Sequence, residues 1–377
     1  MKTKIYLSSP HMGGKERSFV EAAFTTNWVA PLGPNVIGFE KDIETFLGNN
    51  NFVAALSSGT AALHLALILL GVKRDDEVLC QSMTFSASAN PIVYLGATPV
   101  FIDSEIETWN ICPIALEEAI KNRISKGKKP KAIIAVDLYG MPYQVDAISH
   151  ISKKYDIPII EDSAEALGSS YKGKMCGTLG DISILSFNGN KIITTSGGGA
   201  LVASSEAIKE KAIFLATQAR DHAPHYQHSE IGYNYRLSNI CAGIGRGQME
   251  VLSKRVQERR KNHQFYTTIF SKIKGVKVFT EPSSDYFSNH WLTCILIDSE
   301  VASFTGDELR NALEKETIES RPLWKPMHLQ PIFQEAPFYG SKKVSEKLFL
   351  QGLCLPSGSN LTSEDLQRIN NVIQQFA

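Results

Sequence analysis

The chain has 377 residues, and its 39 lysines and arginines balance its 39 aspartates and glutamates, so the formal net charge is zero. No overall field therefore draws it to nucleic acid or to an anionic membrane, and an anionic ligand must be held by local groups. The N-terminus lacks the apolar stretch of a signal peptide and no run reaches the roughly 18 residues of a membrane span, so we expect a cytoplasmic protein. Six scattered cysteines without a CxxC pair favour reduced thiols over a zinc site or disulfides.

Short apolar strands alternate with helices along the first half of the chain. A helix at 14–25 and a loop rich in proline and glycine come first. We then expect helix 38–47, strand 52–56, helix 61–67, strand 77–80, helix 85–95, strand 98–102, helix 113–121, strand 131–138, helix 145–155 and strand 157–160. Near-continuous apolar strands joined by helices predict a mostly parallel sheet covered on both faces, with ligands at the carboxyl ends of its strands.

A turn of small residues, Ser58, Gly59 and Thr60, follows the strand at 52–56 and opens an apolar helix. The backbone amides at such a helix start form an anion site, to which the two hydroxyls can add donors. An ordinary serine or threonine helix cap explains the same residues.

The stretch DISILSFNGNKIITTSGGGA, residues 181–200, organises the rest of the chain. Its apolar run ends at a turn that begins with Asn188, and Lys191 follows next to Ile192 and Ile193. An amine partly removed from water is more available as a nucleophile, which a Schiff-base lysine requires. The alternative is a hairpin with a solvated lysine at its tip.

The second half of the chain begins with strand 200–203, helix 206–216 and a polar loop that holds three histidines. These histidines lack the HExxH or paired-cysteine pattern of a zinc site, so we expect no metal. One long or broken helix, 237–270, then leads to strands at 276–279 and 290–297 and to helices at 306–316, 342–351 and 363–376. We predict a large domain at 1–250 and a small α+β domain at 251–377. The loop RPLWKPMH at 321–328 combines cationic, aromatic and imidazole groups that suit ligand contact.

Three features along the chain together predict a pyridoxal-phosphate enzyme. Asp162 stands at a strand end 29 residues before Lys191, Ser186 stands five residues before it, and the turn at 58–60 offers an anion site. Such an enzyme needs a lysine for the Schiff base, a carboxylate to keep the pyridine nitrogen protonated, and a cup of hydroxyls and amides for the phosphate.

Five motifs resemble the DegT/StrS family of sugar-nucleotide aminotransferases nearly end to end: SFNGNKIITTSGGGA, EDSAEALGS, SSGTAALHLAL, GYNYRLSN and RPLWKPMH. The resemblance implies the aspartate aminotransferase-like fold type I, with a large, mostly parallel seven-stranded sheet and a small C-terminal domain. Within the family, the motifs look most like bacterial enzymes that aminate UDP-4-keto-6-deoxy-N-acetylhexosamines on the way to bacillosamine or related diamino sugars. Many relatives have a histidine where this chain has Asn188.

The resemblance also implies roles for individual residues. Lys191 forms the Schiff base with the cofactor and moves the proton, while Asp162 pairs with the pyridine nitrogen. The other residues implied to bind the cofactor are Gly59, Thr60 and Ser186 at the phosphate, Phe85 on the ring, Glu165 near the 3-hydroxyl, Asn188, and Asn234 from the neighbouring subunit of a homodimer. The residues implied to bind the sugar nucleotide are Pro31, Gly33, Arg220, His225, Tyr226, His228, Arg236, Trp324 and His328.

The implied reaction moves the amino group of L-glutamate to the C4 ketone of UDP-2-acetamido-2,6-dideoxy-4-keto-hexose, giving a UDP-4-amino sugar for surface glycans or glycoproteins. One alternative is amination of GDP-4-keto-6-deoxymannose, as in perosamine synthesis. A second is removal of a C3 hydroxyl, but relatives with that activity carry histidine in place of the Schiff-base lysine. A third is a binding protein without cofactor on the same scaffold.

Overall fold

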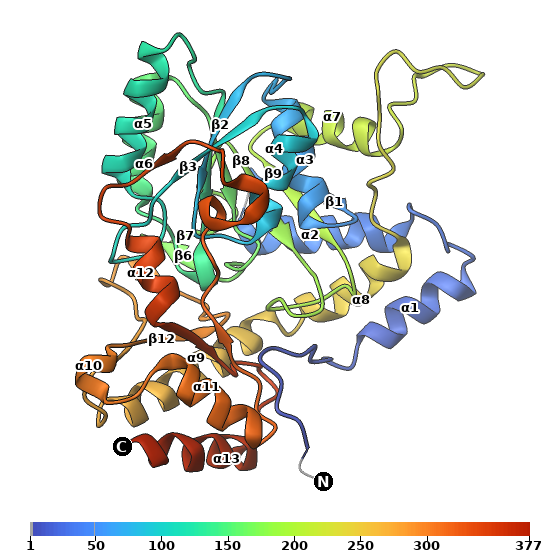
Figure 1. The fold of residues 1–377 in the computed structure, drawn as a ribbon. Coiled ribbons are helices and arrows are strands. Elements are labelled where there is room, and N and C mark those ends of the chain that lie inside the picture. Colours follow the sequence, from blue (N-terminus) through green and yellow to red (C-terminus); the bar gives the residue numbers. More distant parts are fainter. Residues whose placement is uncertain (1–2, 49) are drawn as a thin grey trace.

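The computed structural model describes residues 3–48 and 50–377. Its helices are α1 (Glu16–Thr25), α2 (Pro34–Leu47), α3 (Gly59–Leu69), α4 (Asn90–Tyr94), α5 (Pro113–Ser125), α6 (Val145–Tyr155), α7 (Glu206–Ala216), α8 (Asn239–Met249), α9 (Leu252–Phe270), α10 (Ser299–Ala302), α11 (Gly306–Lys315), α12 (Val344–Gln351) and α13 (Ser363–Ile373) (Figure 1). Its strands are β1 (Phe52–Leu56), β2 (Glu77–Gln81), β3 (Thr98–Ile102), β4 (Ala132–Val136), β5 (Ile159–Asp162), β6 (Ser170–Tyr171), β7 (Lys174–Met175), β8 (Ile182–Ser186), β9 (Gly199–Ala203), β10 (Val276–Val278), β11 (Tyr286–Phe287), β12 (Thr293–Ile297), β13 (Arg321–Pro322), β14 (Phe338–Tyr339) and β15 (Gly352–Leu355).

The large sheet has the strand order β1-β9-β8-β5-β4-β2-β3-β14, and every pairing from β8 to β14 is parallel. The predicted α/β fold class is confirmed, but the sheet has eight strands and not seven. The additional strand, β14, pairs with β3 through Phe338 and Phe101. It comes from a turn-rich segment far along the chain, and two residues are too few for a strand periodicity to show.

Helices cover both faces of this sheet, as its apolar strands predicted. Alternate residues of a strand point to opposite faces. Val78 on β2 packs into the core under α3 and α7, whereas Leu79 packs into the core under α5 and α6. Figure 1 shows these two pairs of helices on opposite sides of the sheet.

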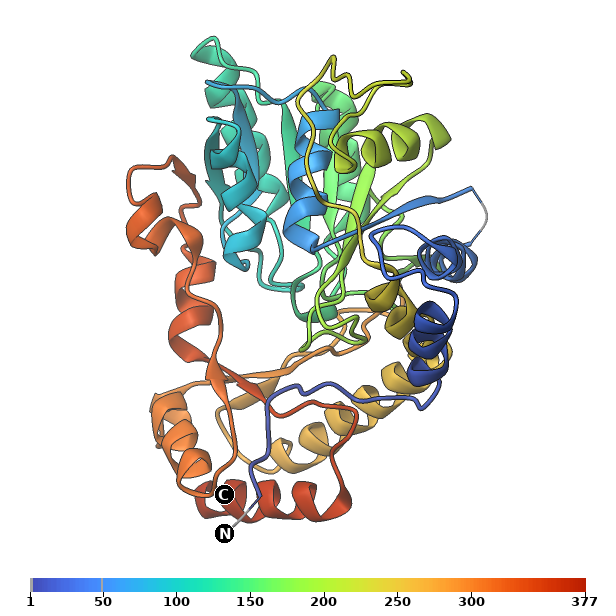
Figure 2. The same cartoon turned by 90° about the vertical axis from the view of Figure 1, so that its right-hand side faces the viewer.

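A second sheet, β10-β12-β15-β13, forms a separate core with α9, α11 and α13. The predicted boundary between a large domain, 1–250, and a small domain, 251–377, stays a prediction, and two segments of the chain cross it. Ile5 packs into this second core and bridges to Ile318, while β14 returns to the large sheet. Figure 2 shows the N-terminal arm rising from the end of the molecule that holds α13 toward α1. The smallest sheet, β11-β6-β7, was not predicted.

Two of the predicted helices differ from those observed for a local reason. The helix at 85–95 is a 3-10 turn, Ser86–Ser88, followed by the short α4, because Pro91 is tolerated only in the first turn of a helix. Helix α2 begins earlier than predicted, at Pro34, a position where proline starts helices well. The segment at 237–270, predicted as one long or broken helix, is broken between α8 and α9. In the described part of the chain, no helix has both the length and the apolar character to cross a bilayer.

Candidate active site

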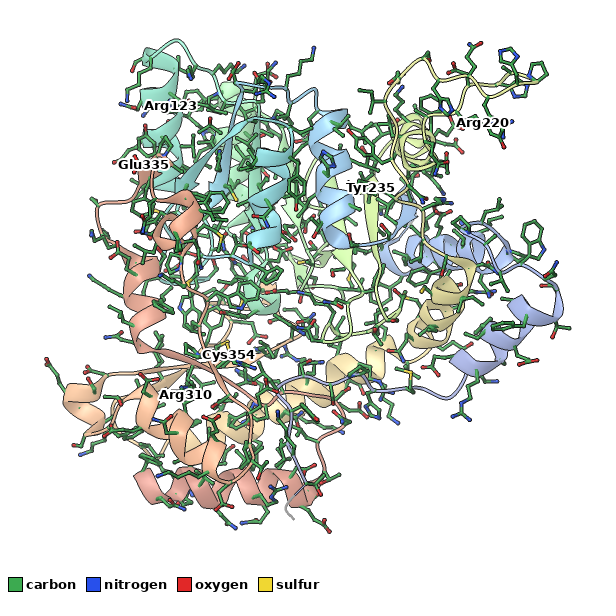
Figure 3. All side chains as sticks on the ribbon, turned by 45° about the vertical axis from the view of Figure 1, so that its right-hand side comes forward. Arg123, Arg220, Tyr235, Arg310, Glu335 and Cys354 are labelled. Atoms are coloured by element: carbon green, nitrogen blue, oxygen red, sulfur yellow. The ribbon has the colours of Figure 1, made fainter. Side chains whose placement is uncertain are left out.

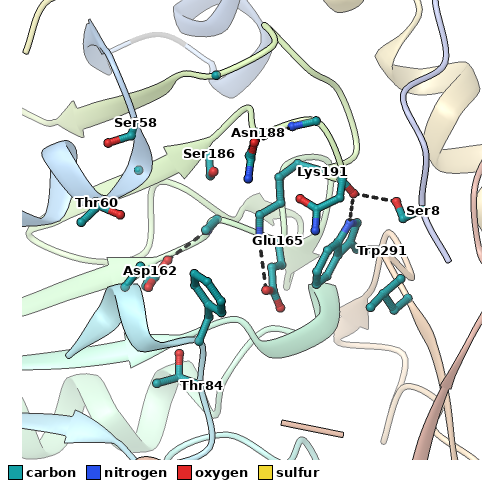
Figure 4. Close-up of a pocket in the computed structure, with 18 of the residues that line it drawn as sticks. Ser8, Ser58, Thr60, Thr84, Asp162, Glu165, Ser186, Asn188, Lys191 and Trp291 are labelled. Carbon is teal, nitrogen blue, oxygen red and sulfur yellow. Dashed lines mark hydrogen bonds and ion pairs between the residues drawn. The ribbon is translucent and has the colours of Figure 1, made fainter. Parts of the chain in front are cut away.

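A pocket of about 880 Å³ opens at the carboxyl ends of the parallel strands. Ser57 and Ser58 follow β1, Asp162 ends β5, and Ser186 ends β8, and all of them line it. The facing wall comes from the N-terminal arm, residues 6–10, and from the second sheet and its connections. Figure 4 shows the labelled side chains of both walls pointing toward a common space.

Lys191 projects into this pocket and is not a solvated lysine at a hairpin tip. Its side chain is only 10% exposed, and the connection between β8 and β9 spans residues 187–198. The Lys191 Nζ atom lies 3.2 Å from Glu165 Oε1 and 4.3 Å from the centroid of the Trp291 ring. The amine therefore has a carboxyl group and an aromatic ring as its neighbours.

Glu165 is a buried carboxyl beside this amine. Its other oxygen, Oε2, accepts a hydrogen bond of 2.7 Å from the backbone amide of Tyr139. Burial raises the pKa of Glu165 to about 7, although the Lys191 charge opposes this shift. Near neutral pH the group is therefore divided between its protonated and its charged form.

Asp162 is a second buried carboxyl in the pocket, and the Ser88 hydroxyl donates a hydrogen bond of 2.6 Å to its Oδ2. Burial raises the pKa of the Asp162 carboxyl, while the bonds from Ser88 and from the Ala164 amide oppose that shift. A cationic N–H placed here would stabilise the charged carboxylate. Ser88, held in turn by the Thr84 hydroxyl at 2.7 Å, was not predicted.

The turn at 58–60 lies directly against the end of β8. The Ser58 Oγ accepts from the Ala61 amide at 3.0 Å, so Ser58 is an ordinary helix cap. The amides of Gly59 and Thr60, in the first turn of α3, have no intrahelical acceptor and remain available to an anion. A Cβ on Gly199 would lie 2.4 Å from the Gly59 nitrogen, so only glycine at 199 permits this close approach.

Phe85, Asn188 and Trp324 complete the pocket among the predicted residues. Phe85 is 57% exposed, and its ring centroid lies 5.6 Å from that of Trp324. An aromatic face left open inside a pocket is suited to packing against a flat ligand.

Most residues predicted to bind the sugar nucleotide lie outside this pocket in the single chain. Arg220, His225, Tyr226 and His228 are exposed on the segment between α7 and α8, which projects from the body of the molecule (Figure 1). Figure 3 shows Arg220 out on this segment, well away from Cys354, which lines the pocket. The Arg220 guanidinium lies 4.4 Å from the centroid of the Tyr226 ring.

Two other residues predicted to bind the sugar nucleotide form hydrogen bonds within the fold instead. Arg236 donates to Glu40 at 2.6 Å and to the Ala55 carbonyl at 2.8 Å. The His328 side chain is 8% exposed, and its Nδ1 lies 2.7 Å from the Ser82 hydroxyl. Both side chains hold the fold together in the single chain and do not face the pocket.

The remaining predicted residues also lie outside the pocket. Gly33 has a φ of +145°, and a Cβ there would clash with Asn239 at 2.7 Å, so its glycine is required by packing. Pro31, two residues before it, is exposed. Asn234 is also exposed and forms an isolated bridge with Thr217.

The sequence patterns missed most of the wall opposite the strand ends. Residues 6–10 and Trp291 line the pocket without belonging to any predicted site, and Arg321 was predicted only as part of the ligand-contacting loop at 321–328. Arg321 is the one arginine among the described lining residues, and its guanidinium pairs with Glu319 at 2.9 Å. Its position in the motif RPLWKPMH was the only available signal.

Residues 10–374 match the DegT/DnrJ/EryC1/StrS aminotransferase family. The chain belongs to this family. It is 51% identical over 376 residues to EpsN of Bacillus subtilis (strain 168), a proposed pyridoxal phosphate-dependent aminotransferase, and the match covers 99% of this chain and 96% of EpsN. It is 37% identical over 369 residues to the GDP-perosamine synthase of Escherichia coli O157:H7, covering 97% of each chain. The solved structure of a DegT DnrJ EryC1 StrS aminotransferase from Brucella abortus superposes with a TM-score of 0.89 at 28% identity, covering 96% of this chain and 95% of that one.

As a member of the DegT/StrS family, the chain is a pyridoxal phosphate-dependent aminotransferase, and the predictions of family, enzyme class and cofactor are confirmed. The alternatives of C3-hydroxyl removal and of a binding protein without cofactor are thereby set aside. The pocket itself fits the cofactor. It contains the buried carboxylate of Asp162 and the amine of Lys191. It also contains the first turn of α3, which approaches Ser186 closely because residues 59 and 199 are glycines.

Proposed function

We propose that this aminotransferase transfers the amino group of L-glutamate to the C4 ketone of a nucleotide-linked 4-keto-6-deoxy sugar. The observation that carries the proposal is the Lys191 amine, 3.2 Å from Glu165, in a pocket that also holds the buried Asp162. An amine nucleophile beside a group that titrates near pH 7 suits a reaction in which a proton is moved between carbon atoms.

The residues of the strand-end wall would hold the cofactor. Ser186 and the amides of Gly59 and Thr60 would bind the phosphate, and Asp162 would hold the proton of the pyridine nitrogen. The residues proposed to contact the ring and its substituents are Phe85, Glu165 and Asn188. When bound, pyridoxal phosphate supplies a ring that takes up negative charge developing at carbon.

Lys191 would act as both nucleophile and base. Its Nζ takes the proton from Cα of glutamate in the first half-reaction and delivers a proton to C4 of the sugar in the second. Glu165, the carboxyl beside Nζ, can accept or return a proton near neutral pH and so keep the amine in its reactive form. The product 2-oxoglutarate leaves before the sugar binds, so ping-pong kinetics follow.

We propose UDP-2-acetamido-2,6-dideoxy-4-keto-hexose as the acceptor, giving a UDP-4-amino sugar for a surface glycan or glycoprotein. The form of the motifs SFNGNK, GYNYRLSN and RPLWKPMH supports this choice. A GDP-linked 4-keto sugar is an equally well supported candidate, because relatives at 37% and 34% identity are named GDP-perosamine synthases. A role in polysaccharide synthesis is supported by a 29% identical relative, the spore coat polysaccharide biosynthesis protein SpsC of Bacillus subtilis.

The sugar-nucleotide side of the site is proposed to be completed by a second copy of the chain. The segment that carries Arg220 and His228 has exposed apolar side chains at Tyr226 and Ile231, 79% and 83% exposed, which suits burial in a homodimer. The single-chain pocket offers only Lys191 and Arg321 as cations for a diphosphate among its described residues. Asn234 of the partner subunit would reach the cofactor phosphate.

The first test is the visible spectrum of the purified protein before and after L-glutamate is added without sugar. A cofactor band that glutamate shifts, followed by its return on adding one 4-keto sugar nucleotide, is the expected result. Binding of UDP and GDP, compared by titration calorimetry, separates the two acceptors. A band that glutamate leaves unchanged would contradict the proposed amino donor.

The shared site has its own test. Co-expression of Lys191→Ala with Asn234→Ala chains gives mixed dimers in which one site carries both changes and the other neither. Two inactive parents should then recover about a quarter of wild-type activity, because random pairing makes half of the dimers mixed. No recovery from dimers shown to be mixed would mean that each chain builds its site alone.

A further inference from the structure

Arg259, on α9, is a buried cation without a counter-ion. It is 1% exposed, and no carboxylate among residues 3–48 and 50–377 lies within ion-pair distance of its guanidinium. Burial, with the neighbouring charge of Arg255, lowers the pKa of Arg259 to about 9, which still leaves it protonated at neutral pH. Burying an unpaired charge costs folding free energy, so a buried arginine at this position calls for a functional explanation.

Its hydrogen bonds run to four segments that are far apart in the sequence. One terminal nitrogen donates to the Trp291 carbonyl and, at 3.3 Å, to the Ser357 carbonyl. The other donates to the Ser8 hydroxyl at 2.9 Å and reaches the Lys191 carbonyl at 3.5 Å. All four acceptors are neutral, so none of them offsets the positive charge of the guanidinium.

Two of these partners, Ser8 and Trp291, also donate hydrogen bonds to the turn that precedes Lys191. The Ser8 hydroxyl donates to the Asn190 carbonyl at 2.6 Å, and the Trp291 indole donates to the same carbonyl at 2.7 Å. The Trp291 ring also lies 4.3 Å from the Lys191 amine. Figure 4 shows Ser8 and Trp291 converging from one side of the pocket on the backbone beside Lys191.

We propose that Arg259 is a positioning residue that latches the N-terminal arm and Trp291 onto the Asn190–Lys191 turn and so holds the Lys191 amine in its reactive place. The inference rests on the proposed role of Lys191.

A matched control lies one helical turn away. Arg255 is also buried and also binds the N-terminal arm, donating to the carbonyls of His11 and Met12 at 3.0 Å each. It pairs with Glu258 at 3.1 Å and has no bond to the Lys191 turn or to Trp291. Loss of Arg255 therefore reports the general effect of losing a buried arginine that contacts the arm.

The experiment compares wild type, Arg259→Gln, Arg259→Lys, Ser8→Ala and Arg255→Gln as full-length holoenzymes. Hydrogen–deuterium exchange is followed for residues 6–10 and 187–198, and the pH midpoint of the visible cofactor band is titrated. Arg259→Gln should speed exchange in both segments, shift the midpoint, and slow the glutamate half-reaction about tenfold or more, because the Lys191 turn is no longer held in place. Arg259→Lys, whose ammonium cannot bond to all four segments at once, should show smaller changes of the same kind. Ser8→Ala should show a smaller loss of rate, and Arg255→Gln should change neither segment 187–198 nor the midpoint.

Equal effects of Arg259→Gln and Arg255→Gln on exchange at 187–198 and on the midpoint would overturn the proposal. If Arg259→Gln does not fold, Arg259→Lys and Ser8→Ala decide, and wild-type rates and exchange in both would overturn it. A wild-type band that does not respond to glutamate would instead contradict the proposed function, because the exchange pattern reports the latch without any turnover.

Discussion

The two walls of the active-site pocket are built in different ways. The wall that would hold the cofactor comes from strand ends in one sheet. Asp162 and Ser186 meet because β5 and β8 are adjacent, and the turn at Gly59 joins them because only β9 separates β1 from β8. The opposite wall comes from the N-terminal arm, Trp291 and Arg321, which belong to no common element. Strand ends converge by topology, whereas the second wall depends on contacts between distant segments, as the bonds of Arg259 illustrate. Changes in the first wall should therefore stop the chemistry, and changes in the second should alter binding and positioning.

The largest effect is expected from Lys191→Ala, which should retain bound cofactor yet lose about 10³-fold or more in turnover, because the chain then has no amine at the reacting carbon. Lys191→Arg is the matched control, since it keeps the charge and removes the nucleophile, and it should be equally inactive. Cofactor content by absorbance and turnover by coupled assay decide. Retained turnover in either variant would contradict the role of Lys191 as nucleophile and base.

Asp162→Asn should lower turnover by about 10²- to 10³-fold, because a neutral amide no longer stabilises positive charge at the ring nitrogen. The amide oxygen can still accept the bond from Ser88, so the thermal midpoint should change little. Steady-state kinetics and a melting curve on the same preparation check both statements. Wild-type kcat in this variant would exclude Asp162 as the partner of the ring nitrogen.

On the opposite wall, Arg321→Gln should raise KM for an anionic substrate about tenfold or more while kcat changes much less, since a charged hydrogen bond contributes about 1.5–3 kcal/mol. Arg321→Lys should restore part of the affinity. Measuring KM separately for L-glutamate and for the sugar nucleotide identifies which anion the guanidinium binds. An unchanged KM for both substrates would leave Arg321 with its ion pair to Glu319 as its only role.

Glu165→Gln should change how the stability of the cofactor-free protein depends on pH. Burial raises the pKa of Glu165 from an ordinary 4.5 to about 7, so between these values the folded state binds more protons than the unfolded state. Wild type should therefore lose stability relative to the glutamine variant as pH rises through this window, by about 3 kcal/mol in all. Urea unfolding of both proteins across the window measures the difference. A difference that does not vary with pH would mean that folding does not raise the pKa of Glu165.

The smallest effect is expected from His328→Gln. Its imidazole packs against Phe338 at 3.7 Å between ring centroids and binds Ser82, outside the pocket. The variant should lose about 1 kcal/mol of stability with no change in KM for the sugar nucleotide. Trp324→Ala, which removes a side chain that does line the pocket, is the comparison. A raised KM in His328→Gln would restore the substrate contact that the sequence predicted.

The order of strands and helices, the positions of Asp162, Ser186 and Lys191 at or just after strand ends, and the family could all be read from local patterns. Apolar periodicity, turn residues and motif spacing act over a few residues, so they are visible in the chain itself. The same patterns failed where a feature is short or set by one residue, as at β14 and at Pro91.

The contacts of the second wall could not be read in this way. Ser8 and Arg259 are 251 residues apart, and Trp291 meets the Asn190 carbonyl across 101 residues. Neither pair has a periodicity or a sequence spacing from which its contact could be predicted. A side chain's partner across such distances is chosen by how the two cores pack together, and Arg236 and His328, which seemed free to bind substrate, are held by Glu40 and Ser82 for that reason. The local sequence therefore determines the secondary structure and the positions of the motifs, whereas the packing of the two cores determines how the pocket is assembled.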